Sequence, residues 1–308
     1  MLQVSDTDIT APEHPLLGAR AAGYPQVPNN TYAGLIDHEQ RIGRRVHLGM
    51  AFARPGRDLL SDSGDRDLAR RDDTTLVQCW KPVDRWSRAD GNDHRATAYI
   101  ARQARAVAAI DSPVMIVVHH EPENDLGRAG TATDYRRMWA HVRDVFDTEG
   151  ATNTVWGIAF MNYPKWDRVI GLLWPEATPP DWVWFNAYGS PSRPDYVDNV
   201  ARFYRGLADQ HWFDPHGALW GIREWSTKGL NVPQSVDYFD AARHAINEGM
   251  FPRLSAHLVF DSPGSEGDAA MRIGFDAAGR PAPIKTAAYT DFAHEDAFGT
   301  PVAPTGSE

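Results

Sequence analysis

Short apolar runs recur along the chain, and each is continuous rather than alternating with polar positions. Each run is six or seven residues long, and together they are rich in Val, Ile and Trp. Strands of a parallel sheet that are buried on both faces have this continuous pattern. We therefore predict eight such strands, at residues 16–22, 46–52, 75–80, 114–120, 154–160, 182–188, 219–225 and 255–261.

Segments with apolar positions at helical spacing separate most of these runs. One helix can begin at Thr133 or Asp134, follows a 3.6-residue period, and reaches Gly150, where a terminating glycine belongs. Residues 93–110 and 236–249 repeat this pattern, and the first of them begins with an acidic cap. The chain thus alternates strands with helices.

Eight strands alternating with helices predict a single-domain α/β fold, the (β/α)8 or TIM barrel. A doubly wound open sheet is the alternative, but no glycine-rich phosphate-binding turn follows any predicted strand. We predict that the barrel occupies residues 16–295, between a polar N-terminal segment at 1–15 and a C-terminal tail at 296–308.

Composition narrows the classes of function and partner. The formal net charge of −10 argues against nucleic-acid binding, because phosphate contacts need clustered Lys and Arg. Because Cys79 is the single cysteine, an intrachain disulfide is excluded, and we expect this residue to be buried in the core. We expect the protein to be a monomer. No apolar run approaches the roughly 20 residues of a membrane span. The N-terminal residues lack a secretory signal, so we expect either a mature secreted or phage-associated protein or a cytoplasmic one.

Two predicted strands end in a glutamate, at the barrel end where active sites lie. Glu121 follows residues 114–120, and Glu224 lies near the end of residues 219–225. Glycoside hydrolysis uses such a pair, one carboxyl group to protonate the leaving oxygen and one to attack or to activate water. Neighbouring residues of a strand point to opposite faces, so we expect Arg223 to face the helices.

A metal site is the alternative interpretation of the polar residues around Glu121. His119, His120 and Glu123 carry ligand atoms, but adjacent strand residues diverge, so the two histidines cannot easily reach one ion. His119 also suits a structural, hydrogen-bonded role. Residues 61–73 lack the closing glutamate of a calcium loop, and we expect a charged surface there. We expect no metal and no cofactor, and a metal-dependent hydrolase is the weakest hypothesis.

The chain resembles glycoside hydrolase family 26, the β-mannanase family. This family belongs to the clan of retaining barrels with glutamates on strands four and seven. The resemblance lies in the His120–Glu121 pair after an apolar strand and in DYRRMWAHVRDVFDTEGATNTVWGIAFMN, which is similar to the family's helix and fifth strand. DWVWFNAYGS, GIREWST and HLVFDSPG follow in the order of strands six to eight, and the similarity spans about residues 16–293.

The resemblance implies a retaining, double-displacement mechanism without a cofactor. Glu224 matches the family's nucleophile, and Glu121 matches its acid/base. His120 matches the histidine that hydrogen-bonds the nucleophile and positions it. Tyr188 matches the strand-six tyrosine, whose hydroxyl would donate a bond that keeps the nucleophile ionised.

Several aromatic and polar residues near the carboxyl ends of the strands are candidates for substrate binding. The resemblance places Trp156 and Trp225 where aromatic rings could stack on sugar faces. The other candidates lie at strand ends or in the loops that follow the strands. The candidates are Trp80, Trp86, Trp156, Trp166, Trp225, His119, Asn162 and Asn186. We expect Trp182 and Trp184, by contrast, in the core.

The chain departs from the family beside the cleaved bond. Val117 stands where the mannanases carry an arginine, residues 122–124 replace Met-Asn-Gly, and Phe260 and Asp261 replace a tryptophan common in the clan. The sugar therefore stays open, and we expect an endo-acting glycosidase of a β-linked polysaccharide: mannan, glucan, xylan or a bacterial cell-wall glycan. A non-catalytic carbohydrate-binding or structural barrel, such as a phage tail-associated module, is the alternative.

Overall fold

The computed structural model of the chain describes residues 12–21, 30–53, 56–208, 218–263 and 267–299, so most of the N-terminal segment and C-terminal tail predicted above lies outside the described residues. Eight parallel strands close into a barrel in sequence order, which confirms the predicted (β/α)8 fold. The strands are β1 (Leu16–Ala21), β2 (Leu48–Ala53), β3 (Thr75–Trp80), β4 (Val114–Val118), β5 (Thr154–Phe160), β6 (Trp182–Gly189), β7 (Leu219–Thr227) and β8 (Leu254–Asp261).

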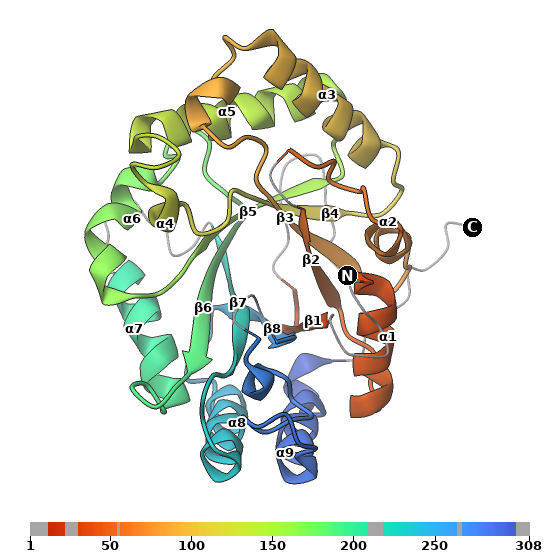
Figure 1. Cartoon of the computed structure of the whole chain (residues 1–308), viewed down its shortest axis with the longest axis vertical. Coiled ribbons are helices and arrows are strands. Elements are labelled where there is room, and N and C mark those ends of the chain that lie inside the picture. The colour runs from red at the N-terminus through yellow and green to blue at the C-terminus, as the bar shows by residue number, and fades with distance from the viewer. Residues whose placement is uncertain (1–11, 22–29, 54–55, 209–217, 264–266, 300–308) are drawn as a thin grey trace.

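Helices surround the sheet and carry the chain from each strand to the next (Figure 1). The α-helices of the described residues are α1 (Thr31–Ile42), α2 (Ser63–Ala69), α3 (His94–Ala108), α4 (Pro122–Asp125), α5 (Ala132–Thr148), α6 (Asp167–Leu173), α7 (Tyr196–Ala208), α8 (Val232–Asn247) and α9 (Pro283–Ala293). Short 3-10 helices are η1 (Trp86–Ala89), η2 (Pro164–Trp166), η3 (Ala269–Met271) and η4 (Asp296–Phe298).

Capping residues set the helix starts. Asp93 accepts from Arg95 N and Ala96 N at 2.9 and 3.1 Å and so begins α3 as expected. Helix α5 begins at Ala132, one residue before Thr133, because Thr131 is its N-cap and forms a capping box with Asp134. These caps fix where each helix leaves the barrel end that carries the polar residues.

Tryptophan fills the interior of the barrel. Trp182 and Trp184 are fully buried, as predicted, and their rings stack with centroids 4.9 Å apart. Gly157 and Gly221 make room for them, since a Cβ atom at Gly221 would lie 2.2 Å from the Trp184 ring. Cys79 lies in the same interior cluster, which confirms its predicted place in the core. The barrel is therefore a packed core, and its chemistry belongs to its ends.

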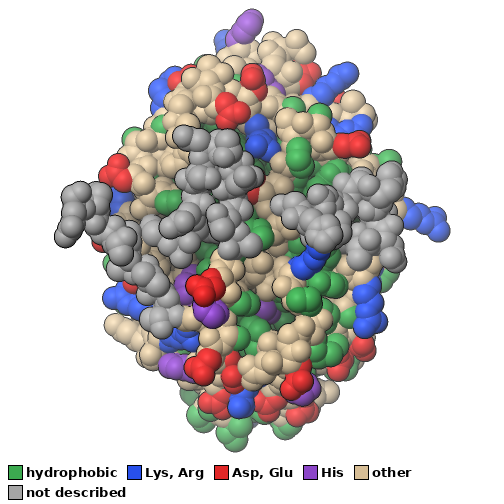
Figure 2. All heavy atoms as spheres, turned by 180° about the vertical axis from the view of Figure 1, so that it is seen from behind, with side chains coloured by type: hydrophobic (Ala, Val, Ile, Leu, Met, Phe, Trp, Pro, Cys, Tyr) green, Lys and Arg blue, Asp and Glu red, His purple; other side chains and the backbone are tan. Residues whose placement is uncertain are grey.

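The surface carries both signs of charge. Acidic and basic side chains are interspersed over the face seen in Figure 2. Among the described residues, no helix is long and apolar enough to cross a membrane.

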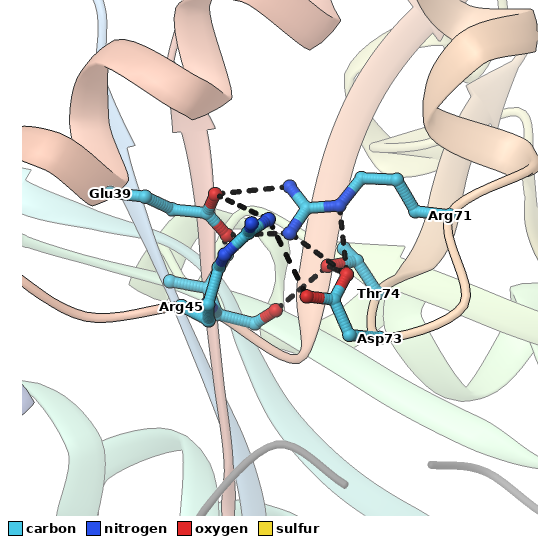
Figure 3. Close-up of polar contacts among 6 residues, drawn as sticks. Glu39, Arg45, Arg71, Asp73 and Thr74 are labelled. Carbon is cyan, nitrogen blue, oxygen red and sulfur yellow. Dashed lines mark hydrogen bonds and ion pairs between the residues drawn. The ribbon is translucent and has the colours of Figure 1, made fainter. Parts of the chain in front are cut away.

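A network of buried and partly exposed polar side chains, here called the basal ion-pair cluster, lies at the amino ends of β2 and β3 (Figure 3). It consists of Glu39, Arg45, Arg71, Asp73 and Thr74. Arg71 Nη1 and Nη2 each lie 3.1 Å from a Glu39 carboxylate oxygen, and Nε donates to Asp73 Oδ1 at 2.8 Å. Thr74 Oγ1 donates to the Val46 carbonyl at 2.9 Å. The expectation of a charged surface at residues 61–73 is therefore wrong for Arg71, which is buried because its charge is paired with the Glu39 carboxylate.

Candidate active site

A bulge in β7 shapes the carboxyl end of the barrel. Strand β7 places one residue more than its neighbours between Ile222 and Trp225, because Ile222 pairs with His257 while Trp225 pairs with Val259. Ile222 and Trp225 both pack in the outer core, so the bulge turns both residues between them toward the barrel interior. The expectation that Arg223 faces the helices is therefore wrong. Strict alternation does not hold across the bulge.

Left-handed backbone places the second glutamate. His119 and Glu121 have φ values of 48° and 57°, which end β4 at Val118 and turn the chain sharply into α4. The Glu121 N–H donates to the Ala159 carbonyl of β5 at 2.8 Å and so anchors the turn. Asn162, at the end of β5, has a φ of 60°. Such strained non-glycine backbone clusters at functional sites.

The two glutamates meet at one nitrogen. Arg223 Nη2 lies 2.8 Å from Glu121 Oε1 and 2.6 Å from Glu224 Oε1. These two oxygens are therefore at most about 5.4 Å apart. Asn186 donates to the same Glu121 oxygen at 2.9 Å and accepts from Arg223 Nη2 at 3.1 Å. We call Glu121, Asn186, Arg223 and Glu224 the shared-cation cluster.

Glu224 has a second donor. The Tyr188 hydroxyl donates to Glu224 Oε2 at 2.8 Å. Burial raises the pKa of the Glu224 carboxyl group, whereas the Arg223 charge and the Tyr188 hydroxyl oppose that rise. Burial and the charge of Glu224 raise the pKa of Tyr188, so the phenol keeps its proton and can only donate here. Both donors favour the charged form of Glu224.

Half-buried side chains surround this pair. Phe52 of β2 contacts His120 edge-on at 5.2 Å and Phe260 of β8 at 6.4 Å, and Tyr188 contacts Phe260 at 6.2 Å, all between ring centroids. The Arg20 guanidinium of β1 lies 5.6 Å from the Phe52 ring centroid. Arg20 and Phe52 were not among the predicted site residues, although strand alternation identifies both. They lie two residues beyond Gly18 and Met50, which face the barrel interior.

His120 lies close to the pair but is differently bonded from the expectation. Its ring contacts Phe52, and its Nδ1 has no hydrogen-bond partner among the described residues. Burial holds the pKa of His120 well below its usual range, so the ring is neutral. The bonds on Glu224 come from Arg223 and Tyr188 instead.

Most of the expected sugar-binding residues lie away from the pair. Trp80, Trp86 and Trp225 are fully buried, and Trp156 is 4% exposed against Trp139 and Phe146. Trp166 is half-buried beside Lys165, with 4.6 Å from Nζ to the ring centroid. The structure therefore brings Glu121, Glu224, Tyr188, Asn186 and His120 together. It buries Trp80, Trp86, Trp156 and Trp225 and leaves Trp166 half-buried beside Lys165.

His119 and Asn162 support neighbouring loops. His119 accepts from Trp86 Nε1 at 3.1 Å, and its Nε2 lies 2.9 Å from Asp125 Oδ2, so both ring nitrogens are engaged. Asn162 donates to the carbonyls of Asn186 and Asn199 at 3.1 and 2.9 Å, which ties the end of β5 to β6 and α7. In the part of the chain that the structure describes, no three His, Cys, Asp or Glu side chains are grouped to hold a metal ion.

Comparison with known proteins was made by sequence and by structure. No protein-family model matches the chain, and no curated protein matches it by sequence. The fold is similar to the catalytic domain of a GH26 endo-β-1,4-mannanase from Bacillus sp. JAMB-750, with TM-score 0.67, 11% identity, and coverage of 96% of this chain and 89% of that one. A Cellulomonas fimi endo-β-1,4-mannanase double mutant gives TM-score 0.63 and 16% identity, over 94% and 75% of the two chains. A GH128 endo-β-1,3-glucanase from Amycolatopsis mediterranei, in complex with laminaritriose, gives 0.53 and 12%, over 90% and 99%. At these identities the likeness establishes a shared barrel fold.

Proposed function

We propose that the chain is a retaining glycoside hydrolase of a β-linked polysaccharide, with Glu224 as nucleophile and Glu121 as acid/base. The observation that carries the proposal is the contact of both carboxylates with Arg223 Nη2. Their nearest oxygens are at most about 5.4 Å apart. Retaining enzymes hold their two carboxyl groups about 5–5.5 Å apart, whereas inverting enzymes need about 6.5–9.5 Å to admit a water. The spacing therefore supports a retaining mechanism.

Glu224 has the surroundings of a nucleophile. Its side chain is 11% exposed, and each of its two carboxylate oxygens has one donor, Arg223 at Oε1 and Tyr188 at Oε2. In the first step Glu224 attacks the anomeric carbon, and the bond from that carbon to the leaving oxygen breaks. Tyr188 and Arg223 hold the attacking group charged and fix its direction.

Glu121 has the surroundings of an acid/base. Its side chain is 19% exposed, more than that of Glu224, and Asn186 fixes one oxygen. It gives its proton to the departing glycosidic oxygen. In the second step it takes a proton from the water that attacks the covalent glycosyl-enzyme, which releases the sugar and frees Glu224.

The substrate class rests on the similar structures. Their names specify endo-β-1,4-mannanases and an endo-β-1,3-glucanase, and all of these enzymes act on β-linked polysaccharides. We propose endo-action on such a polymer, with mannan, glucan, xylan and a bacterial cell-wall glycan as the candidates. A place in family 26 is part of this proposal.

A polysaccharide panel tests the function. The purified chain is incubated with mannan, β-1,4- and β-1,3-glucan, xylan and bacterial cell-wall glycan, and new reducing ends are measured. We expect cleavage of at least one polymer, with the β-anomer formed first in proton NMR. Glu121→Gln and Glu224→Gln should abolish cleavage, while Glu149→Gln, a surface change beside Arg105, should not.

The same experiment separates the alternatives. An α-anomer as first product would replace the retaining mechanism by an inverting one. Binding of a polymer by both the wild type and Glu224→Gln, with no cleavage by either, would favour a non-catalytic carbohydrate-binding barrel. The observation that favours this second candidate is the contact of Arg223 with Glu121 as well as with Glu224, since an ion-pair cluster of this kind can also be purely structural.

A further inference from the structure

Arg223 is fully buried, yet its hydrogen-bonding groups are unequally used. Nη2 lies within 3.1 Å of three acceptors, one oxygen each from Glu121, Asn186 and Glu224. Nη1 contacts the Cys79 Sγ at 3.7 Å, and Nε has no hydrogen-bond partner among the described residues. Nη2 carries two protons, so three acceptors must share them. The guanidinium therefore acts on both carboxylates through one nitrogen.

Packing also helps to place Arg223. The bulge in β7 turns it inward, and its guanidinium carbon lies 5.8 Å from the Phe52 ring centroid. Arg20 approaches the same ring at 5.6 Å, but it donates to Thr31 Oγ1 and not to a carboxylate. Two arginines thus flank one phenylalanine, and only Arg223 is bonded to the glutamates among the described residues.

We propose that Arg223 is a positioning residue that couples the two carboxylates: by sharing Nη2 it fixes their separation and keeps Glu224 ionised beside a second carboxylate. Without the Arg223 charge, burial and the neighbouring Glu121 would favour uptake of a proton by Glu224, whereas the proposed mechanism needs that proton on Glu121. The inference rests on the proposed function, because it assigns Arg223 a part in the same reaction.

The charged and hydrogen-bonding groups around Glu224 come from three strands and from the turn after a fourth. Arg223 belongs to β7 itself, Tyr188 to β6 and Arg20 to β1, while Glu121 follows β4. Burial is the largest influence and raises the pKa of Glu224, and Glu121 raises it further. Arg223 lowers that pKa more than Tyr188 or Arg20 does. Removing the Arg223 charge should therefore raise the pH at which Glu224 becomes an anion.

The first test is the pH profile of kcat/KM in Arg223→Met, on the polymer found in the panel. The acid limb reports ionisation of the nucleophile, so we expect it to move up by about 1–3 pH units. Arg20→Met is the matched control, since it removes the other guanidinium from the Phe52 ring, and its acid limb should move much less. A lower kcat in Arg223→Met with an unmoved acid limb would reduce Arg223 to a structural role and overturn the proposal.

The second test needs no activity. Carbon-13 NMR of the chain labelled at glutamate carboxyls follows the titration of Glu224, which is assigned by the signal lost in Glu224→Gln. Arg223→Met should raise its midpoint. Glu121→Gln, a change of nearly equal shape, should lower the midpoint because it leaves Arg223 to one carboxylate. If no polymer is cleaved, the proposed function fails, and these midpoints still decide the inference. An unchanged midpoint in Glu121→Gln overturns it even where Arg223→Met does not fold.

Discussion

Two arginines of this barrel each lie between two carboxylates, at opposite ends of the strands. In the basal ion-pair cluster, Arg71 meets Glu39 through two nitrogens and Asp73 through Nε. In the shared-cation cluster, Arg223 meets Glu121 and Glu224 through one nitrogen. Both guanidiniums are buried. The two sites differ in how well donors and acceptors are matched.

In the basal ion-pair cluster the donors of Arg71 are matched to acceptors, so the arrangement is fixed. In the shared-cation cluster the donors of Arg223 are not matched to acceptors, so the arrangement can change. Every nitrogen of Arg71 that can donate has a carboxylate oxygen, and any rearrangement loses a charge-assisted bond. Within the part of the chain that the structure describes, Arg223 has no partner at Nε and divides Nη2 among three acceptors. Changes in the basal cluster should therefore alter stability, and changes in the shared-cation cluster should alter activity. Three predictions test this difference, and a fourth concerns stability at acid pH at the amino end of the barrel.

The largest effect should come from Glu224→Gln. The amide cannot attack, so kcat/KM should fall on the order of 10⁴-fold or more, as when a nucleophile is removed from other enzymes. The free energy of unfolding should change little or rise, because one of two neighbouring negative charges is lost. Reducing-end release and urea denaturation measure the two quantities.

Asp73→Asn is the matched control for Glu224→Gln, since it makes the same kind of change beside Arg71. It should keep its activity and lose stability, because Arg71 lowers the pKa of Asp73 in the folded chain despite the opposing effect of burial. Equal activity losses in both variants would remove the distinction between the clusters.

Arg71→Met should have the next largest effect, on stability alone. It leaves Glu39, which is 5% exposed, with the Val46 N–H and the more distant Arg45. Breaking a buried pair in this way costs about 3–5 kcal/mol. Urea denaturation measures the loss, and kcat of the folded protein should stay at the wild-type level. Arg105→Met breaks an exposed pair with Glu149 and should cost less than about 1 kcal/mol. Equal losses would mean that Arg45 replaces Arg71.

Tyr188→Phe should have a smaller effect, on activity. It removes one donor from Glu224, and a hydrogen bond to a charged group is worth about 1.5–3 kcal/mol, so kcat/KM should fall about 10- to 100-fold. The control is Tyr135→Phe, because the Tyr135 hydroxyl donates to the Val118 carbonyl at 3.4 Å and, among the described residues, to no carboxylate. An unchanged kcat/KM in Tyr188→Phe would show that Arg223 alone positions Glu224.

The smallest effect concerns the amino end of the barrel and acid pH. His47 accepts from the Leu17 N–H at 3.0 Å, and burial lowers its pKa from 6.5 to about 4. Between these values the unfolded chain binds a proton that the folded chain does not. Stability is therefore present above pH 6.5 and is lost as pH falls toward 4, by at most about 1.4 kcal/mol per pH unit.

His47→Asn keeps an acceptor for Leu17 but does not titrate, so the slope of unfolding free energy against pH should become shallower in this window. Urea denaturation at several pH values measures the slope. His94→Asn, at an exposed position, should leave it as it is. An unaltered slope in His47→Asn would assign the acid sensitivity to another group, such as His257, whose pKa burial lowers to about 3.

The sequence predicted the barrel well because buried parallel strands carry their own signal. All eight predicted runs are strands, and their ends agree within two residues. The largest differences have local causes. Strand β4 stops at Val118 because His119 adopts a left-handed backbone, and α5 starts early because Thr131 is the better cap. Such details depend on backbone geometry that apolar periodicity does not contain.

The candidate site was only partly predictable, and its catalytic roles remain predictions. The rule that barrel chemistry lies at strand ends identified Glu121, Glu224 and Tyr188, which the structure brings together. Strict alternation then failed at the bulge, where Arg223 joins Glu224 inside the barrel. Trp225 was expected against a sugar from the family resemblance, but its ring lies in the outer core, where alternation from the inward-facing Glu224 puts it. This bulge depends on how β7 pairs with both β6 and β8, so it cannot be predicted from the sequence of β7 alone.

The bulge also ties the chemistry of the site to a single codon. An in-frame deletion of Arg223 would leave Ile222, Glu224 and Trp225 in regular order, which alternates outward, inward and outward without any bulge. The glutamate would keep its direction and lose its cation. Evolution could therefore switch between a lone carboxylate and a coupled pair by insertion or deletion of one residue, a change that comparison of substitutions alone would miss.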